Sequence, residues 1–188
     1  MIKWKQALIK FKNFIQKLKL FGHAGRRKRS TGNTEKKLVI VREFDAPREM
    51  VWKAWTDEEH HQKWWGPESY TSPFCKIDLK VGGRYLFCMR SPKGKEYWTT
   101  GEFLEISAPE KLVYTDAFSD KDGNVLTPPE NEFSPELPQY VKVTVLLVEK
   151  NKKTIMTLIH EGIEEDEMKQ MAERVWNEAF NKMAVSFE

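Results

Sequence analysis

One segment limits the fold of this chain more than any other: a strand-like stretch that leads directly into two short helical stretches. Residues 37–44 (KLVIVREF) are rich in β-branched and apolar side chains, which favours a strand. Asp45 then stands where a helix N-cap is expected, and Pro47 suits the first helical turn, where an N–H has no partner. Thr56-Asp57 restarts a second helix that ends at residues 64–67 (WWGP). The segment therefore predicts a domain that mixes helices and strands.

After this segment the pattern changes to strands that are separated by turn residues. Gly82-Gly83 marks a hairpin turn, and residues 120–138, rich in Pro, Asp and Glu, predict a mobile loop. From Glu164 onward, apolar residues at helical spacing predict one long terminal helix. We expect strands at residues 69–79, 84–91, 96–107, 111–118, 139–149 and 153–161. These elements predict an α+β helix-grip arrangement, in which a curved antiparallel sheet wraps the terminal helix.

Charge divides the chain into two unequal parts. Residues 1–37 carry twelve Lys and Arg and a single acid, Glu35, which gives a net charge of +11. Residues 38–188 hold the remaining 19 bases and 27 acids, which gives a net charge of −8. Such a break is typical of a basic arm attached to an acidic domain. We therefore divide the chain into a basic amphipathic helix (1–21), a basic flexible linker (22–36) and one folded domain (37–188).

The basic helix has an apolar side and a lysine-rich side. The apolar side consists of Ile2, Trp4, Ala7, Leu8, Phe11, Phe14, Ile15, Leu18 and Phe21, and six lysines are interleaved with it. No apolar run is long enough to cross a bilayer or to serve as a signal peptide. We therefore expect a cytoplasmic protein, with a membrane surface as an alternative location. The residues that would meet an anionic membrane are Trp4, Lys5, Phe11, Lys12, Phe14 and Lys17.

Other uses of this helix stay open. The alternatives are an element that packs on its own domain or on a second copy of the chain, and a segment that is disordered in isolation. The run Arg26-Arg27-Lys28-Arg29 would suit nucleic-acid phosphates, but we disfavour nucleic acid as a partner.

The titratable side chains do not form a recognisable catalytic or metal-binding motif. His60 and His61 are adjacent, so on a helix they point about 100° apart and do not face one metal ion. Cys75 and Cys88 are too few for a disulfide framework. We expect no metal, no cofactor and no catalytic residue. An enzyme remains the alternative, with an inward-facing carboxylate among Glu102, Glu105 and Asp116 as its base.

Aromatic side chains are the most suggestive feature that remains. The chain holds seven Trp among its 188 residues, which indicates either a thick aromatic core or an apolar cavity that is lined by rings. The second interpretation predicts that some of these rings line a pocket for an apolar molecule, with polar groups from Tyr85, Tyr114, Thr144 and His160. The full set of cavity candidates is Trp64, Trp65, Tyr85, Phe87, Trp98, Tyr114, Phe118, Thr144, His160, Trp176 and Phe180.

Several motifs together resemble a known family. They are Ala46 to Trp52, Trp55-Thr56-Asp57, Trp64 to Pro67, Asp78 to Gly83, and Gly101 with Pro109 to Leu112. The combination resembles the START-like (SRPBCC) superfamily and, within it, the group related to the C-terminal domain of the Hsp90 ATPase activator (AHSA1). The resemblance implies a helix-grip fold that holds a small apolar molecule in a cavity between the sheet and the terminal helix. It also implies two alternatives, a partner of an Hsp90-type chaperone and a cyclase- or hydrolase-like enzyme of polyketide metabolism.

The basic helix leads to a first prediction: the full-length protein binds anionic membranes reversibly. Each Lys or Arg near a charged surface contributes roughly 1 kcal/mol at low salt, and the apolar side adds an insertion energy that salt does not screen. In liposome sedimentation, we expect binding to anionic vesicles that falls with added salt without vanishing, and no binding to neutral vesicles. A protein that stays in the supernatant with both vesicle types would rule out the membrane role.

Overall fold

The computed structural model describes residues 37–127, 138–163 and 166–188. The predicted basic helix and linker lie outside the described residues, as do residues 128–137 of the predicted loop and residues 164–165. Within the described residues, no helix is both long enough and apolar enough to cross a membrane.

The described residues form one antiparallel sheet of seven strands. Its strand order is β1-β7-β6-β5-β4-β3-β2, so the first strand of the chain pairs with the last. The strands are β1 (Lys37–Phe44), β2 (Thr71–Ile77), β3 (Arg84–Arg90), β4 (Glu96–Ser107), β5 (Lys111–Ser119), β6 (Val141–Lys150) and β7 (Lys153–Glu161). Every strand that the sequence predicts is present, with bounds that differ by a few residues.

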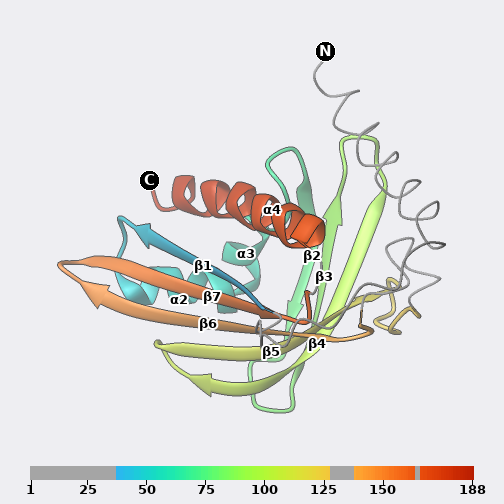
Figure 1. Cartoon of the computed structure of the whole chain (residues 1–188), viewed down its shortest axis with the longest axis horizontal. Coiled ribbons are helices and arrows are strands. Elements are labelled where there is room, and N and C mark those ends of the chain that lie inside the picture. Colours follow the sequence, from blue (N-terminus) through green and yellow to red (C-terminus); the bar gives the residue numbers. More distant parts are fainter. Residues whose placement is uncertain (1–36, 128–137, 164–165) are drawn as a thin grey trace, which may run out of the picture.

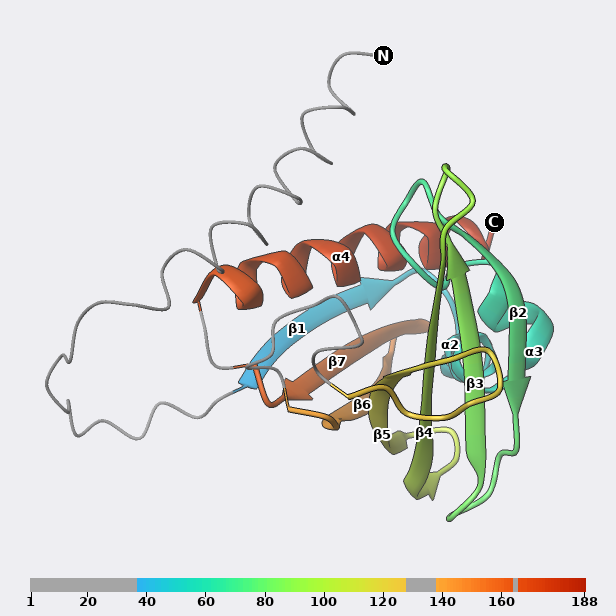
Figure 2. The same cartoon turned by 90° about the vertical axis from the view of Figure 1, so that its right-hand side faces the viewer.

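Three helices complete the described fold. Two short ones, α2 (Arg48–Thr56) and α3 (Glu58–Gln62), follow β1, and the long helix α4 (Asp166–Val185) follows β7. The sheet curves around α4, which lies along its concave side (Figure 1). Helices α2 and α3 close one end of the curve, beside the C-terminal end of α4 (Figure 2). The arrangement confirms the predicted helix-grip fold.

Local hydrogen bonds explain how the short helices begin. The Asp57 carboxylate accepts the backbone N–H of His60 at 3.1 Å, so Asp57 caps α3, at the place where the sequence predicts that a second helix begins. The prediction that Asp45 caps α2 is wrong. Helix α2 starts directly after Pro47, which occupies the N-cap position, and no side chain makes a capping hydrogen bond there. Proline fixes the backbone φ angle near the value that a helix needs, which favours a start at this position.

Buried side chains fasten these short helices to the rest of the domain. Trp64 Nε1 donates to the Ala54 carbonyl oxygen at 2.8 Å, which joins the turn after α3 to α2. The Thr154 hydroxyl donates to the Ala46 carbonyl oxygen at 2.7 Å, which joins β7 to the start of α2. Because these polar groups are buried and paired, each contributes to stability instead of costing it. The two helices are thereby held against the interior that α4 also faces.

Candidate functional site

The space between α4 and the sheet is filled by aromatic side chains from almost every element around it. Trp55 comes from α2, Trp64 and Trp65 follow α3, and Trp176 and Phe180 come from α4. The sheet contributes the remaining rings, which are Tyr85, Phe87, Phe103 and Tyr114. Each of these nine side chains is at most 8% exposed. We call this set the aromatic interior.

Most of the predicted cavity residues lie in this interior. The structure brings together Trp64, Trp65, Tyr85, Phe87, Tyr114, Trp176 and Phe180. Their rings meet in close tilted and edge-to-face pairs, with centroids 5.5 Å apart for Tyr85 and Tyr114 and 5.7 Å apart for Trp65 and Trp176. Such contacts contribute about 0.5–1.5 kcal/mol per pair beyond the burial of area.

Two further candidates lie at the border of the interior. His160 is on the inner side of β7, and its Nδ1 accepts a hydrogen bond of 3.2 Å from Trp176 Nε1 on α4. Burial lowers the pKa of His160 to about 4, so the ring is neutral at physiological pH. Phe118 lies opposite Thr99 on the inner side of β5 and is partly exposed. Both residues are therefore placed beside the aromatic interior.

Trp98 and Thr144 do not face the interior. Side chains alternate between the two faces of a strand, and on β4 it is Thr99 that lies opposite the inner residue Phe87. Trp98 therefore projects to the outer face, where its ring lies 5.4 Å from that of Phe74. On β6, Val143 and Val145 are fully buried on the inner side, which leaves Thr144 on the outer side.

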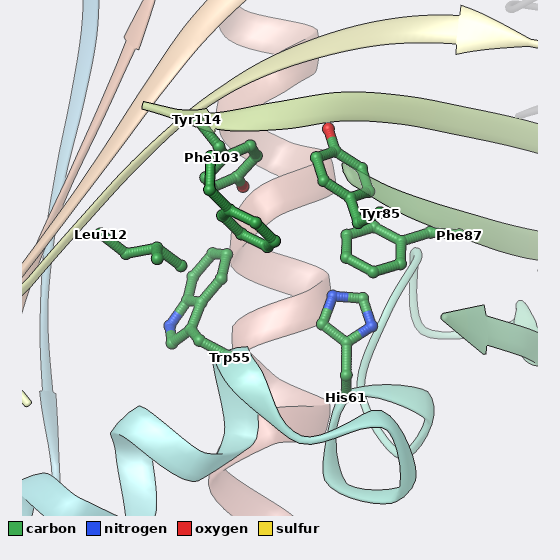
Figure 3. A pocket seen from close by; sticks show the side chains of 7 residues that line it. All are labelled: Trp55, His61, Tyr85, Phe87, Phe103, Leu112 and Tyr114. Atoms are coloured by element: carbon green, nitrogen blue, oxygen red, sulfur yellow. The ribbon is translucent and has the colours of Figure 1, made fainter. Parts of the chain in front are cut away.

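Sequence reasoning missed four residues that line the centre of this interior. A narrow pocket is lined by Trp55, His61, Tyr85, Phe87, Phe103, Leu112 and Tyr114, and Figure 3 shows these side chains pointing toward one another. Trp55, His61, Phe103 and Leu112 were not among the candidates. For His61 the sequence does hold a signal, because Trp64 and Trp65 follow it at the helical spacings of three and four residues.

The pocket is closed in this structure. The surrounding rings fill it so completely that it holds no space for a water-sized molecule. A ligand therefore enters only if some of the rings move.

His61 is the least expected side chain in the pocket. Its imidazole is 0% exposed and stacks on the Phe87 ring at a centroid distance of 3.9 Å. The Trp65 ring lies 4.9 Å away. Burial among these rings lowers the pKa of His61 to about 3, so the imidazole is neutral at physiological pH. A neutral imidazole carries one N–H donor and one acceptor nitrogen.

Several polar atoms in the interior have no hydrogen-bond partner among the described residues. They are both ring nitrogens of His61, Nε1 of Trp65, the Tyr114 hydroxyl and Nε2 of His160. A buried donor or acceptor without a partner costs about 1–3 kcal/mol. Purely apolar side chains of similar shape would avoid this cost. The interior therefore combines tight apolar packing with unused hydrogen-bonding capacity.

A carboxylate and a tyrosine form a second polar feature on the inner side of the sheet. The Tyr85 hydroxyl donates to Asp116 Oδ1 at 2.6 Å and also lies 2.9 Å from the Thr115 carbonyl oxygen. Burial raises the pKa of Asp116 to about 6, and the hydrogen bond from Tyr85 opposes that rise. Gly101 makes this arrangement possible, since a Cβ there would overlap the Thr115 carbonyl and the Tyr85 ring.

These groups set what the site can do chemically. Of the three carboxylates considered as a base, Glu102 and Glu105 are exposed, whereas Asp116 faces inward. The described residues contain no group of His, Cys, Asp and Glu side chains that would hold a metal ion. Cys75 and Cys88 are free and buried. The arrangement suits recognition of a mostly apolar molecule that carries a few polar atoms.

Comparisons with known proteins agree with this architecture. The model of the family described as "Activator of Hsp90 ATPase homolog 1-like protein" matches residues 45–188. No curated protein matches the chain.

Similar solved structures come from several bacteria. A protein from Arthrobacter aurescens, solved by NMR, is 28% identical with a TM-score of 0.69, over 84% of this chain and 89% of that one. A crystal structure from Mycobacterium smegmatis is 23% identical with a TM-score of 0.67, over 86% and 96% of the two chains. The AHSA1 protein from Silicibacter pomeroyi is 22% identical with a TM-score of 0.63, over 79% and 95%. The last two likenesses concern the fold alone.

The burial of His61 generates a pH prediction. The ring titrates near 6.5 in the unfolded chain and near 3 in the folded chain. Between these values the unfolded chain binds a proton that the folded chain does not, so stability falls as pH falls below about 6.5. His61→Phe removes this contribution. Between pH 7 and pH 4.5, we expect the free energy of unfolding to fall by about 2.5 kcal/mol less in the variant than in the parent, measured by urea unfolding at both values.

Two other residues define the controls for this experiment. Asp116 acts in the opposite direction, because its folded pKa lies above its ordinary value of 3.8, so its contribution to stability grows as pH falls through about 6. That contribution is common to the parent and the variant. Val148→Ala, at an exposed position on β6, changes no titratable group and is expected to leave the parent's pH dependence in place. If the free energy of unfolding falls by the same amount between pH 7 and pH 4.5 in His61→Phe and in the parent, His61 is not held neutral in the folded state.

Proposed function

The chain belongs to the family of Activator of Hsp90 ATPase homolog 1-like proteins, and on this premise we propose that it binds a small, mainly apolar molecule between its sheet and α4. The observation that carries the proposal is the fully buried His61 ring, whose two nitrogens have no partner among the described residues. A core that served only for packing would gain stability from a phenyl ring at this position. A bound molecule with one acceptor and one donor would use both nitrogens.

The surroundings of His61 define the class of molecule. Phe87 and Trp65 offer ring faces, and Leu112 and Phe103 offer further apolar surface. Trp65 Nε1 adds an unused donor, and the Tyr114 hydroxyl adds an unused group that both donates and accepts. These groups suit a flat apolar molecule that carries polar atoms at its edge. A negatively charged molecule fits poorly, since the aromatic interior offers no positive charge and burial already keeps His61 neutral.

Entry of the molecule requires a pair of rings to separate. Within the aromatic interior, Trp65 and Trp176 keep the largest exposed fractions, 7% and 8%, so they lie nearest to solvent. Their rings meet edge to face at 5.7 Å. Trp65 precedes Gly66, whose φ angle of +90° is one that a glycine adopts without strain. We assign the entry to this Trp65–Trp176 contact.

The alternatives rest on weaker support. A chaperone-regulating role follows only from what the family is named for, and no described feature favours it over ligand binding. An enzyme would use Asp116 as its base, but the Tyr85 hydroxyl already occupies Oδ1 of this carboxylate. Membrane association concerns residues 1–21, which lie outside the described residues, and stays a prediction.

A neutral fluorescent probe, N-phenyl-1-naphthylamine, tests the proposal. It is flat and apolar and carries one N–H group, which the acceptor nitrogen of His61 would take up. We expect saturable binding at one probe per chain. His61→Phe is expected to weaken the binding about tenfold, because one hydrogen bond of about 1.4 kcal/mol is lost.

The control is Val148→Ala on the outer side of β6, which leaves the interior unchanged and should bind the probe like the parent. Circular dichroism of each variant checks that it is folded. Probe binding that does not saturate, or equal affinity of the parent and the folded His61→Phe variant, would contradict the proposed site.

A further inference from the structure

The outer face of the sheet carries an apolar surface on β1, β7 and β6. Val39 lies opposite Ile159, and Ile159 lies opposite Thr144; one step along, Val41, Thr157 and Leu146 form the next row. Ile155 lies opposite Val148 in a third row. We call Val39, Val41, Leu146, Val148, Ile155 and Ile159 the outer apolar face.

No described segment covers this face. Val39, Val41 and Val148 are 46%, 64% and 58% exposed. Helix α4 lies on the concave side of the sheet, opposite to this face (Figure 1). An antiparallel sheet with one side in water normally alternates apolar and polar residues, but residues 38–41 (LVIV) are apolar on both sides of β1. Strands of this kind are usual where a sheet is covered on both faces.

Charged pairs mark the two ends of the face. Lys142 Nζ lies 3.0 Å from Glu161 Oε1 at one end. At the other end, Lys153 Nζ lies 3.5 Å from Glu43 Oε1. The centre of the face, between these pairs, consists of apolar and threonine side chains. It therefore suits a partner whose own apolar surface is a narrow strip with charges along its margins.

We propose that residues 1–21 of the same chain cover the outer apolar face as an amphipathic helix. The sequence gives this segment an apolar side of nine residues with lysines along its margins. A helix about 10 Å wide matches three strands that are spaced about 4.8 Å apart. The six lysines of residues 1–21 also favour contact with residues 38–188, which carry a net charge of −8.

The connection to β1 permits this arrangement. Residues 22–36 reach at most about 50 Å when extended, whereas a helix of residues 1–21 is only about 31 Å long. The segment therefore has enough chain to turn back onto the strand that it precedes. A tether of this length also gives the segment an effective concentration in the millimolar range. At ordinary protein concentrations, residues 1–21 of the same chain are therefore favoured over a second copy of the chain as the segment that covers the face.

Thiol labelling of the full-length protein tests the proposal. In Val41→Cys the new thiol sits at the most exposed position of the face, while the native Cys75 and Cys88 are buried and react slowly. We compare its rate of labelling by a maleimide with the rate in a triple variant that also carries Phe11→Asp and Phe14→Asp. These two changes break the apolar side of the segment, so we expect labelling to become at least about fivefold faster. Anionic lipid is left out, since it would compete for the same apolar side.

Two further variants make the outcome unambiguous. Lys93→Cys, in the exposed turn between β3 and β4, should label at the same rate with and without the two aspartates. Val148→Cys repeats the test on β6, so that a folding defect in one variant does not decide the result. The proposal fails if both face positions label as fast as Lys93→Cys in both backgrounds, because the face is then open. It also fails if protection grows with protein concentration and light scattering shows a dimer, because a second copy then covers the face.

Discussion

The packing of Trp55 against α4 holds the two sides of this domain together. Its ring lies 6.0 Å from Trp176 and 6.3 Å from Phe180, both on α4, and 4.7 Å from Trp64. Its Nε1 donates to Met156 Sδ on β7 at 3.3 Å. One side chain of α2 thus contacts α4, β7 and the turn after α3. The Trp55 ring also lines the pocket that contains His61, and burial in this interior keeps the His61 imidazole neutral.

A closed interior with unused polar atoms has a consequence for binding. The free protein carries the cost of leaving His61, Trp65 and Tyr114 unpaired, and a molecule that satisfies these groups recovers that cost when it binds. Against this gain stands the work of separating packed rings. Lys182 on α4 limits which rings move, because its Nζ lies 2.8 Å from the Tyr70 carbonyl oxygen and 3.2 Å from that of Gly66. The last part of α4 and this turn are therefore tied to each other, and local ring rotation is the less costly way to open the site.

The fold was predictable from the sequence because its signals are local. The β-branched composition of strand 37–44, the start signals of the two short helices and the apolar stripe of the terminal helix each indicate an element, and all of these elements are present. The site was predictable only in part. Trp98 was placed inside because it is aromatic, although Phe103 lies an odd number of residues away and strand alternation puts the two on opposite faces. His61 was missed because it was judged as half of a metal-binding pair and not by its helical spacing from the two tryptophans. The raised pKa of Asp116 was beyond prediction, since it depends on burial among strands that are distant in sequence.

The central claim is that the interior is a binding site and not only a core. Native mass spectrometry of the protein, purified from its own cells without organic solvent, tests this claim most directly. The account predicts a second species, heavier than the 22.2 kDa chain by the mass of one small molecule, which disappears on denaturation and is absent from a His61→Phe variant prepared in the same way. A single species at the mass of the chain, under conditions that preserve a known ligand complex of similar affinity, would contradict it.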